Sequence, residues 1–217
     1  MSKKLILFPF GGNARDSLLS ILAINAIRKT WNIIGFMDDS LSKREKVCCG
    51  IKVKGGRELI KRFSEAMVLA VPGNAVNYLE RRNIIMSLGI ERERFATIIH
   101  PSVIVAEDAE IGYNVTVMPN VFIGCGAKIG NHCVILPNTV VSHDSKVGDY
   151  CCIGSSVAIS GYVNIGRESY IGSGVKIREN ICIGNRALVG IGSNVVSDIE
   201  EGIVAIGNPA RRLRKVK

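Results

Sequence analysis

Apolar and polar positions follow two different rhythms along this chain. From Lys3 to about residue 95, apolar runs alternate with segments that have helical spacing. Strands are expected at residues 3–8, 32–39, 66–73 and 94–99, and helices at 14–29, 56–63 and 74–90. This alternation predicts a small parallel α/β sheet covered by helices, and right-handed crossovers would make it Rossmann-like.

After Ile99 the rhythm becomes a strict six-residue repeat. Every sixth residue from Ile99 to Val195 is isoleucine or valine, and glycine often follows it. A six-residue period is typical of a parallel β-helix, in which three hexads complete one triangular coil and the aliphatic side chains fill the interior. We therefore expect two domains. Residues 1–98 form the α/β domain, and residues 99–217 form the β-helix with a basic C-terminal tail.

Composition fits this plan and restricts the classes of partner. The 217 residues include 23 glycines and only 6% aromatic residues, which suits a fold of small and β-branched side chains. A net charge of +9 favours an anionic partner such as a nucleotide or a cofactor phosphate, although residues 210–217 supply part of it. No RNP-like, helix-turn-helix or zinc-finger pattern accompanies the charge, so nucleic acid is not an expected partner.

The cysteines and apolar runs indicate a compartment. Seven cysteines occur without a CxxC pair, and the apolar run near the start is too short for a secretory leader. No apolar run approaches the length that crosses a bilayer. The expectation is a soluble cytoplasmic protein with free thiols and no membrane partner.

One polar pair, His143-Asp144, interrupts the repeat. His143 stands two residues after the inward Val141, so we expect it to point outward near a corner, one coil before Gly161. A histidine can remove a proton from an amine or a hydroxyl near neutral pH, and a neighbouring carboxylate supports that role. A glycine amide can stabilise the oxyanion formed when a thioester is attacked. The pattern therefore suits direct acyl transfer. A polar turn residue without chemistry is the alternative interpretation.

Three features together resemble a known family. They are the hexapeptide repeat, the closing segment "AIGNPAR" at residues 205–211, and the pair "HD" followed by "SKVG". The chain resembles left-handed β-helix sugar acetyltransferases with an N-terminal Rossmann-like domain, which modify nucleotide-linked amino sugars for bacterial surface glycans. It also resembles the related sialic-acid O-acetyltransferases. The resemblance implies a left-handed coil, acetyl-CoA as co-substrate, no metal, and a homotrimer with active sites between subunits.

The same resemblance implies roles for particular residues. His143 is the general base and Asp144 its partner. Backbone contacts to acetyl-CoA are implied at Gly161, Ser173, Ile191 and Gly192. Cys152 stands where some relatives have a second histidine near the thioester, and a small packing residue is the alternative for that position.

The α/β domain is expected to hold the acceptor, a sugar or nucleotide sugar. The ends of its strands should converge on one crevice, as in other open α/β sheets. The candidate residues at these ends are Gly11, Gly12, Asn13, Asp38, Asp39 and Gly73. Relatives that bind nucleotide sugars commonly have a longer Gly-Gly-His turn, so the sequence leaves open whether the acceptor carries a nucleotide.

Other function classes remain in view. A non-catalytic trimeric sugar-binding scaffold would show the same repeat. A γ-type carbonic anhydrase with zinc between subunits would need a close histidine pair, and His100, His132 and His143 are too widely spaced. His100 is expected to mark the start of the β-helix and His132 to be a solvated turn residue. An NAD dehydrogenase is not expected, because the α/β domain is short, the G-x-G-x-x-G fingerprint is absent and nothing downstream suggests hydride chemistry.

Overall fold

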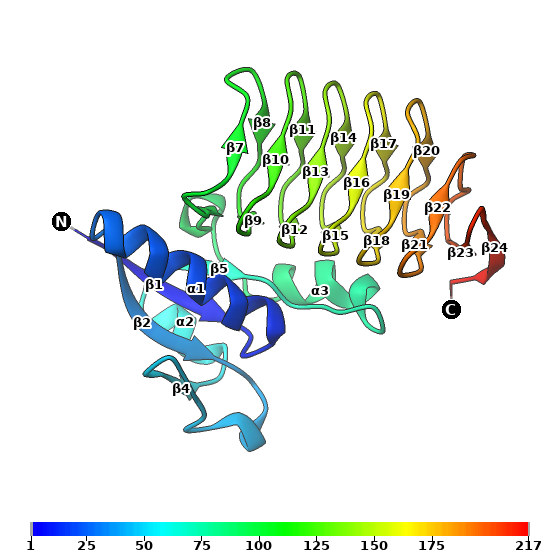
Figure 1. Cartoon of the computed structure of the whole chain (residues 1–217). Coiled ribbons are helices and arrows are strands. Elements are labelled where there is room, and N and C mark those ends of the chain that lie inside the picture. Colours follow the sequence, from blue (N-terminus) through cyan, green and yellow to red (C-terminus); the bar gives the residue numbers. More distant parts are fainter. Residues whose placement is uncertain (1, 217) are drawn as a thin grey trace.

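The computed structural model describes residues 2–216 and begins with an α/β domain (Figure 1). Its sheet has the order β3-β4-β2-β1-β5, and only the β3–β4 pairing is antiparallel. Leu5, Ile6 and Leu7 of β1 are fully buried, as expected for a strand that is covered on both faces. The strands are β1 (Lys3–Phe8), β2 (Trp31–Met37), β3 (Val47–Cys48), β4 (Ile51–Gly55) and β5 (Met67–Ala70).

Two of the three helices of this domain are shorter than the sequence predicts, while α1 has the predicted length and begins two residues earlier. They are α1 (Gly12–Ile27), α2 (Glu58–Arg62) and α3 (Arg81–Met86), with 3-10 turns η1 (Leu41–Lys43), η2 (Tyr78–Glu80) and η3 (Arg92–Arg94). The helix predicted at 74–90 begins late because the Asn74 side chain accepts a hydrogen bond from Val76 N at 2.8 Å, which stabilises a turn. The strand predicted at 94–99 is wrong for most of its length, and β3 and β4 were not predicted.

The rest of the chain forms a rod of short parallel strands, arranged in three sheets. Each sheet is named here after one central strand. The β13 sheet contains β7 (Ile104–Val105), β10 (Phe122–Ile123), β13 (Val140–Val141), β16 (Ala158–Ile159), β19 (Lys176–Ile177) and β22 (Asn194–Val195). The β14 sheet contains β8 (Glu110–Ile111), β11 (Lys128–Ile129), β14 (Lys146–Val147), β17 (Asn164–Ile165) and β20 (Cys182–Ile183). The β15 sheet contains β6 (Ile98–Ile99), β9 (Thr116–Val117), β12 (Val134–Ile135), β15 (Cys152–Ile153), β18 (Tyr170–Ile171), β21 (Leu188–Val189), β23 (Ile203–Gly207) and β24 (Ala210–Lys215).

The six-residue repeat forms the interior of this rod. Every repeat aliphatic from Val117 to Val195 is at most 3% exposed. Burial of each such side chain contributes about 1.5–3 kcal/mol before entropic costs. The glycine that follows many of them lets successive coils approach. A Cβ on Gly154, for example, would lie 2.4 Å from Ser173 N in the next coil.

The corners of the rod have a second six-residue period. From position 114 to position 192, every sixth residue has a positive φ, a conformation that Gly, Asn and Asp tolerate better than other residues. We call these the left-handed corner positions. They are Asn114, Asn120, Gly126, His132, Asn138, Asp144, Tyr150, Ser156, Tyr162, Glu168, Gly174, Asn180, Arg186 and Gly192.

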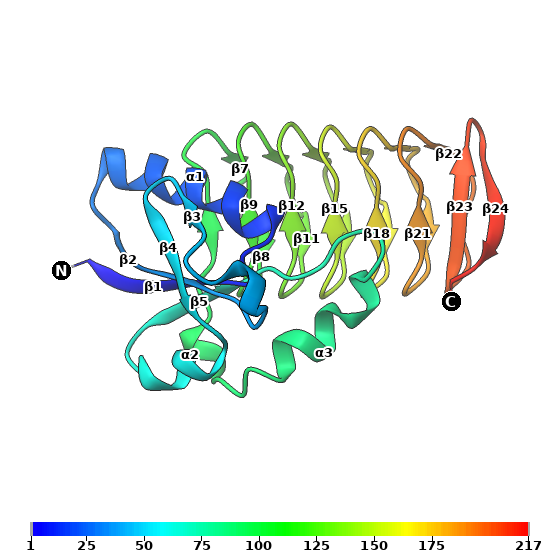
Figure 2. The same cartoon turned by 90° about the horizontal axis from the view of Figure 1, so that it is seen from below.

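The predicted fold class, an α/β domain followed by a left-handed parallel β-helix, is confirmed. The antiparallel β23–β24 hairpin ends the rod (Figure 2) and contains most of the predicted basic tail, while Lys217 lies outside the described residues. The predicted boundary between residues 98 and 99 falls within β6, which pairs with β9 of the rod. That boundary stays a prediction.

Buried polar contacts join the α/β domain to the β15 sheet. The Asn114 side chain accepts a hydrogen bond from Ala70 N and donates one to Ala70 O, each at 2.8 Å. Arg81 is fully buried and donates to His132 O from Nε at 3.1 Å and from Nη2 at 2.7 Å, and to Pro72 O from Nη1. Since buried polar groups are costly when unpaired, these contacts fix how the two domains meet.

The prediction that His132 is a solvated turn residue is wrong. Its side chain is only 2% exposed and stacks on Tyr150, with ring centroids 4.6 Å apart and an interplanar angle of 9°. Its Nδ1 lies 2.8 Å from Asn114 Nδ2. Burial, and then the charge of Arg81, lower the pKa of His132 to about 4.

This low pKa predicts acid sensitivity of the fold. The unfolded chain binds a proton at His132 near the ordinary pKa of 6.5, whereas the folded chain does so only near 4. The contribution of neutral His132 to the free energy of unfolding should therefore be complete above pH 6.5. The free energy of unfolding should fall by about 3 kcal/mol as the pH drops to 4. Urea unfolding at pH 7 and pH 5 measures the difference. His132→Asn, which suits the left-handed corner, should show a flatter dependence. An equally steep dependence in that variant would contradict the assignment.

Candidate active site

His143 and Asp144 lie at a corner between β13 and β14. Asp144 occupies a left-handed corner position with φ 58°, which short polar side chains adopt readily. His143 Nδ1 lies 2.9 Å from Asp144 Oδ2, and the side chains are 57% and 46% exposed. An ionised carboxylate only accepts hydrogen bonds, so Nδ1 carries the hydrogen of this contact, and in a neutral imidazole Nε2 then keeps its lone pair. The pair therefore presents an oriented base on the surface.

Gly161 packs directly against the ring of His143, one coil further along the rod. A Cβ on Gly161 would lie 2.5 Å from Cε1 and 2.6 Å from Nε2 of His143. Real side chains do not approach so closely, so only glycine permits this orientation of the ring. Within residues 2–216, no hydrogen bond uses the Gly161 N–H, which leaves a donor beside the imidazole. The amide and the imidazole therefore lie side by side, and their roles as oxyanion donor and base stay predictions.

The other predicted acetyl-CoA contacts lie on a different edge of the rod. We call the corners between the β13 and β14 sheets the His143 edge, and those between the β15 and β13 sheets the Ser173 edge. Ser173, Ile191 and Gly192 belong to the Ser173 edge, so the β13 sheet separates them from His143. Ile191 is 75% exposed, and Gly192 N donates to Ser173 O at 2.9 Å. One chain therefore does not bring the two sets together.

The turns that end β1 and β5 do converge. The sequence predicts that Gly12 and Asn13 lie in a turn before the helix, but both belong to the first turn of α1. Asn13 Nδ2 donates to Gly73 O at 3.1 Å and Val71 O at 3.4 Å, which ties the start of α1 to the end of β5. Asn13 and Gly73 line a narrow cleft against the β15 sheet, together with Tyr170 and Cys152. The ends of β1 and β5 thus meet, as the sequence predicts for two of the strands. The cleft between the domains is the candidate acceptor site.

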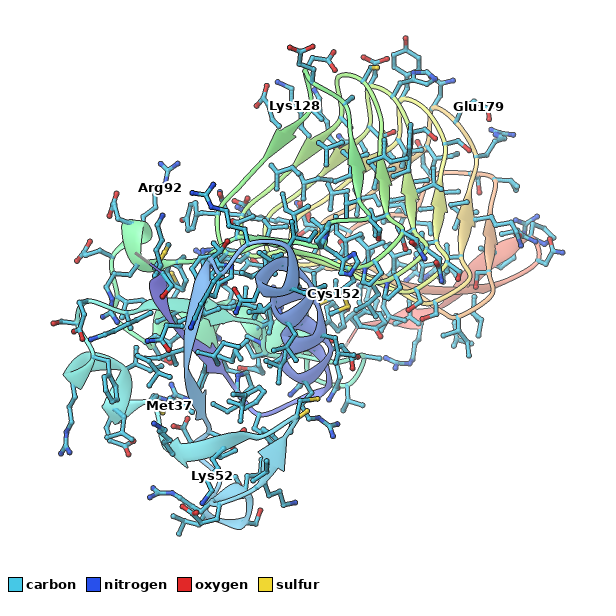
Figure 3. The ribbon with its side chains drawn as sticks, turned by 60° about the vertical axis from the view of Figure 1, so that its left-hand side comes forward. Met37, Lys52, Arg92, Lys128, Cys152 and Glu179 are labelled. Carbon is cyan, nitrogen blue, oxygen red and sulfur yellow. The ribbon has the colours of Figure 1, made fainter. Side chains whose placement is uncertain are left out.

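Cys152 belongs to this cleft and not to the His143 edge. Its side chain is 5% exposed and packs in a cluster with residues of the α/β domain, and Figure 3 places it between the two domains. Burial raises the pKa of its thiol, which disfavours the thiolate. In the same view Glu179, which follows Gly161 by one coil on the His143 edge, lies on the side of the rod away from the α/β domain. The cleft between the domains and the His143 edge of one chain therefore face different directions.

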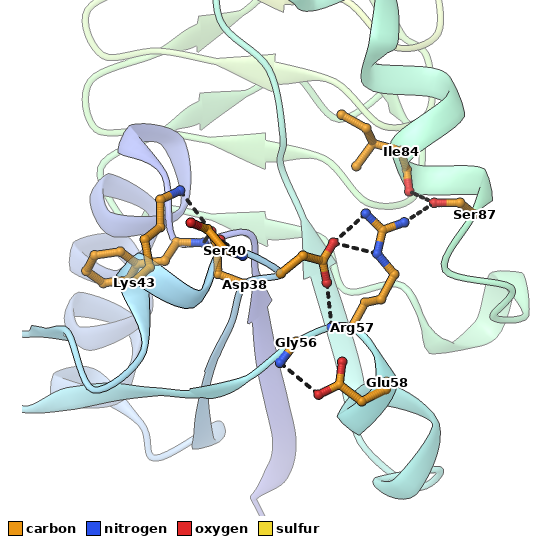
Figure 4. A network of polar contacts seen from close by, with 10 residues as sticks. Asp38, Ser40, Lys43, Gly56, Arg57, Glu58, Ile84 and Ser87 are labelled. Carbon is orange, nitrogen blue, oxygen red and sulfur yellow. Dashed lines mark hydrogen bonds and ion pairs between the residues drawn. The ribbon is translucent and has the colours of Figure 1, made fainter.

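Asp38 and Asp39, at the end of β2, are engaged in a local network (Figure 4). Asp38 is 4% exposed, accepts a hydrogen bond from Phe10 N at 2.9 Å and pairs with Lys43 at 3.0 Å. Asp39 accepts from Arg57 N at 2.9 Å and Arg57 Nε at 2.6 Å. Partial burial acts to raise the pKa of Asp39, but the hydrogen bonds and charge of Arg57 outweigh it and lower that pKa. In this structure both carboxylates stabilise loops at the sheet edge.

Sequence reasoning missed Arg81 and Tyr162. Arg81 forms the floor behind Gly73, since its Cβ lies 3.7 Å from where a Gly73 Cβ would be. Tyr162 contacts His143, with ring centroids 5.2 Å apart and an interplanar angle of 86°. The sequence signal for Tyr162 is an aromatic residue at a left-handed corner position. The aliphatic repeat does not reveal which residues occupy these corner positions.

Residues 2–216 contain neither a candidate metal site nor a candidate membrane-spanning helix. No three His, Cys, Asp or Glu side chains are grouped so as to hold a metal ion. None of the helices in this range has both the length and the apolar character needed to cross a membrane.

Comparison with known proteins places the chain in a family. The family model described as the GMPPB C-terminal domain matches residues 95–204, more than half of the chain. The chain belongs to the GMPPB C-terminal domain family. The match covers the β-helix up to the start of β23, including His143, Gly161 and the Ser173 edge up to Gly192. A comparison of this family member with curated proteins found no match.

Solved structures match the α/β domain of this chain as well as its β-helix. The acetyltransferase domain of PglB from Neisseria gonorrhoeae FA1090 is 26% identical, with a TM-score of 0.85 over 98% of this chain and 100% of that one. That domain has also been solved in complex with acetyl coenzyme A. The predicted resemblance to hexapeptide-repeat sugar acetyltransferases is confirmed.

Two more distant structures support the fold alone. PerB from Caulobacter crescentus, in complex with CoA and GDP-perosamine, is 24% identical, with a TM-score of 0.83 over 99% of this chain and 98% of that one. WeeI from Acinetobacter baumannii AYE is 18% identical, with a TM-score of 0.72 over 98% and 100% of the two chains. The two-domain arrangement is thus shared along nearly the whole length of each protein.

Proposed function

We propose that this protein transfers an acetyl group from acetyl-CoA to an amino group of a nucleotide-linked sugar, as a step in surface-glycan synthesis. One observation carries the proposal. His143 is oriented by Asp144 and packed on Gly161, beside an unused amide, in a fold that matches the PglB acetyltransferase domain over 98% of the chain. The choice of an amino acceptor is supported by PerB, a structural neighbour solved in complex with CoA and GDP-perosamine.

The residues of the His143 edge fit a direct transfer. Acetyl-CoA supplies the acetyl group as a thioester. His143 Nε2 accepts the proton of the attacking amine while the new N–C bond forms, and Asp144 stabilises the imidazolium. The Gly161 N–H donates to the carbonyl oxygen as it becomes negative. The C–S bond then breaks, and the proton held by His143 passes to the departing sulfur.

The Ser173 edge would hold the rest of acetyl-CoA through backbone amides. Within residues 2–216, no hydrogen bond uses the N–H of Ser173 or Ile191, so both are open to a ligand. The Gly192 N–H is already bonded to Ser173 O and is a weaker candidate. Cys152 would contact the acceptor side and not the cofactor, because it lines the cleft between the domains.

The separation of the two edges favours a homotrimer with active sites between subunits. A second copy that packs on the β13 sheet would bring its Ser173 edge or its cleft to the His143 edge of the first. The outer face of that sheet is apolar near its start, where Ile104, Phe122 and Val140 are 63%, 42% and 38% exposed. Exposed apolar faces of this kind mark interaction surfaces, and closed cyclic assembly is the common solution for identical chains.

Phe122→Glu is expected to weaken this assembly. A carboxylate at the centre of an apolar contact must be desolvated, at a cost of several kcal/mol for each buried copy. Light scattering after size-exclusion chromatography should give a smaller species than the wild type, with circular dichroism unchanged and acetyl transfer reduced. Lys146→Glu, an exposed change on the β14 sheet, is the matched control and should leave the mass unaltered. Equal masses for Phe122→Glu and wild type would contradict the interface.

The proposed function is tested by release of CoA thiol from acetyl-CoA with a panel of acceptors. The panel contains nucleotide-linked 4-amino sugars, among them GDP-perosamine, together with free amino sugars and sialic acids. Turnover with a nucleotide-linked amino sugar supports the proposal. Turnover confined to sialic acids would indicate O-acetylation, and ligand binding without turnover on any acceptor would indicate a non-catalytic scaffold.

A further inference from the structure

Tyr162 is an exception among the left-handed corner positions of its edge. The other such positions on the His143 edge are Gly126, Asp144 and Asn180, all residue types that adopt a positive φ at little cost. Tyr162 has φ 59° and a bulky aromatic side chain, for which this conformation is unfavourable. Backbone strain of this kind persists where the surrounding structure or a function requires it.

Packing explains the comparable strain at Tyr150 but not at Tyr162. Tyr150 also sits at a left-handed corner position, and its ring stacks on the buried His132 at the domain interface. The side chain of Tyr162 is 57% exposed, and no hydrogen bond joins its hydroxyl to another of residues 2–216. Little apolar burial therefore offsets the strain at this position.

The contact that Tyr162 does make is with the proposed base. Its ring meets His143 edge-on, with centroids 5.2 Å apart, and its backbone N–H donates to His143 O at 3.1 Å. Edge-to-face aromatic pairs prefer defined orientations. The imidazole is thus held by Asp144 at Nδ1, by Gly161 against one face, and by Tyr162. An exposed histidine with fewer contacts would sample other rotamers.

We infer that Tyr162 is a positioning residue that keeps the imidazole of His143 in the orientation required for proton removal. The inference rests on the proposed acetyl transfer and adds to it a residue that acts through the base. The aromatic ring is the active part. The hydroxyl is not required, since it has no partner in residues 2–216.

Three variants test the inference once wild-type turnover has been established. Tyr162→Asn removes the ring and suits the positive φ, so it should fold at least as stably as wild type while kcat falls about 10- to 100-fold. KM for acetyl-CoA should change less than about twofold, because the cofactor amides are untouched. Tyr162→Phe should retain kcat within about twofold of the wild type. Arg186→Asn, another exposed left-handed corner position, is the matched control and should leave kcat unchanged.

The outcomes separate this inference from the proposed function. No turnover by the wild type on any acceptor overturns the function itself. With an active wild type, normal kcat in Tyr162→Asn overturns positioning by the ring. A loss in Tyr162→Phe as large as that in Tyr162→Asn also overturns it, because the hydroxyl would then be the acting group. Positioning by the ring is supported if kcat falls in Tyr162→Asn but stays near the wild-type value in Tyr162→Phe and in the Arg186→Asn control.

Discussion

Replacement of His143 by alanine is expected to reduce kcat for acetyl transfer about 10²- to 10⁴-fold. The variant loses the imidazole that Asp144 orients and that we propose as the acceptor of the substrate's proton, and general-base catalysis contributes on that scale. Since His143 is 57% exposed and on the surface of the rod, its removal should leave folding intact. Binding of acetyl-CoA should persist, because the amides of Gly161, Ser173 and Ile191 are unchanged.

The measurement combines thiol release with calorimetric titration of acetyl-CoA, on the assembled protein. His100→Ala is the matched control, because His100 lies at the start of the rod and, among residues 2–216, its ring hydrogen-bonds to Ser102 alone. The control should keep wild-type kcat. An active His143→Ala variant would mean that another group removes the proton, and the catalytic assignment would fail.

Gly161→Ala is expected to have the second-largest effect. The new Cβ would overlap the His143 ring, so the imidazole must rotate away from its present position on Asp144. The ring is exposed and can move, so the loss of stability should stay below about 1 kcal/mol. Misplacement of a base by about 1 Å can cost about 10² in rate, and kcat should fall by that order.

A double variant shows whether the clash is the cause. If the methyl group acts only through His143, adding Gly161→Ala to His143→Ala should lower kcat no further, since the coupled residues are not additive. A further loss in the double variant would indicate that Gly161 acts independently, for example through its amide. Unchanged kcat in Gly161→Ala alone would contradict the packing of the imidazole on this glycine.

The six-residue repeat made the β-helix predictable. The conformation of its corners and its interface with the α/β domain could not be predicted in this way. One aliphatic side chain in every six residues points into the rod, so the repeat identified the interior residues up to Val195. The same count placed His143 at an outward corner. The burial of His132 depends on which face of the rod meets the α/β domain, and no periodicity encodes that. Asp38 and Asp39 have partners from loops, Lys43 and Arg57, whose paths follow no repeat.

The candidate site was predicted in part. The closeness of Gly161 to His143 follows from one coil of the repeat, and the resemblance implied that Asp144 is the partner of His143. The geometry of that pair required the structure. The contribution of Tyr162 required the structure, because it depends on a positive φ and on ring geometry. The division of the predicted contacts between two edges follows from the spacing as well, because Ser173 stands 12 residues after Gly161 (173 − 161 = 12), which is two hexads and not a whole coil.

The most direct test of the central claim is a mass-spectrometric time course with acetyl-CoA and a nucleotide-linked 4-amino sugar. Direct transfer predicts that CoA thiol and acetylated sugar appear in equal amounts, that no thiol is released without the sugar, and that the protein itself never carries an acetyl group. Thiol release without acceptor, or an acetylated protein that forms before the product, would contradict direct transfer at His143.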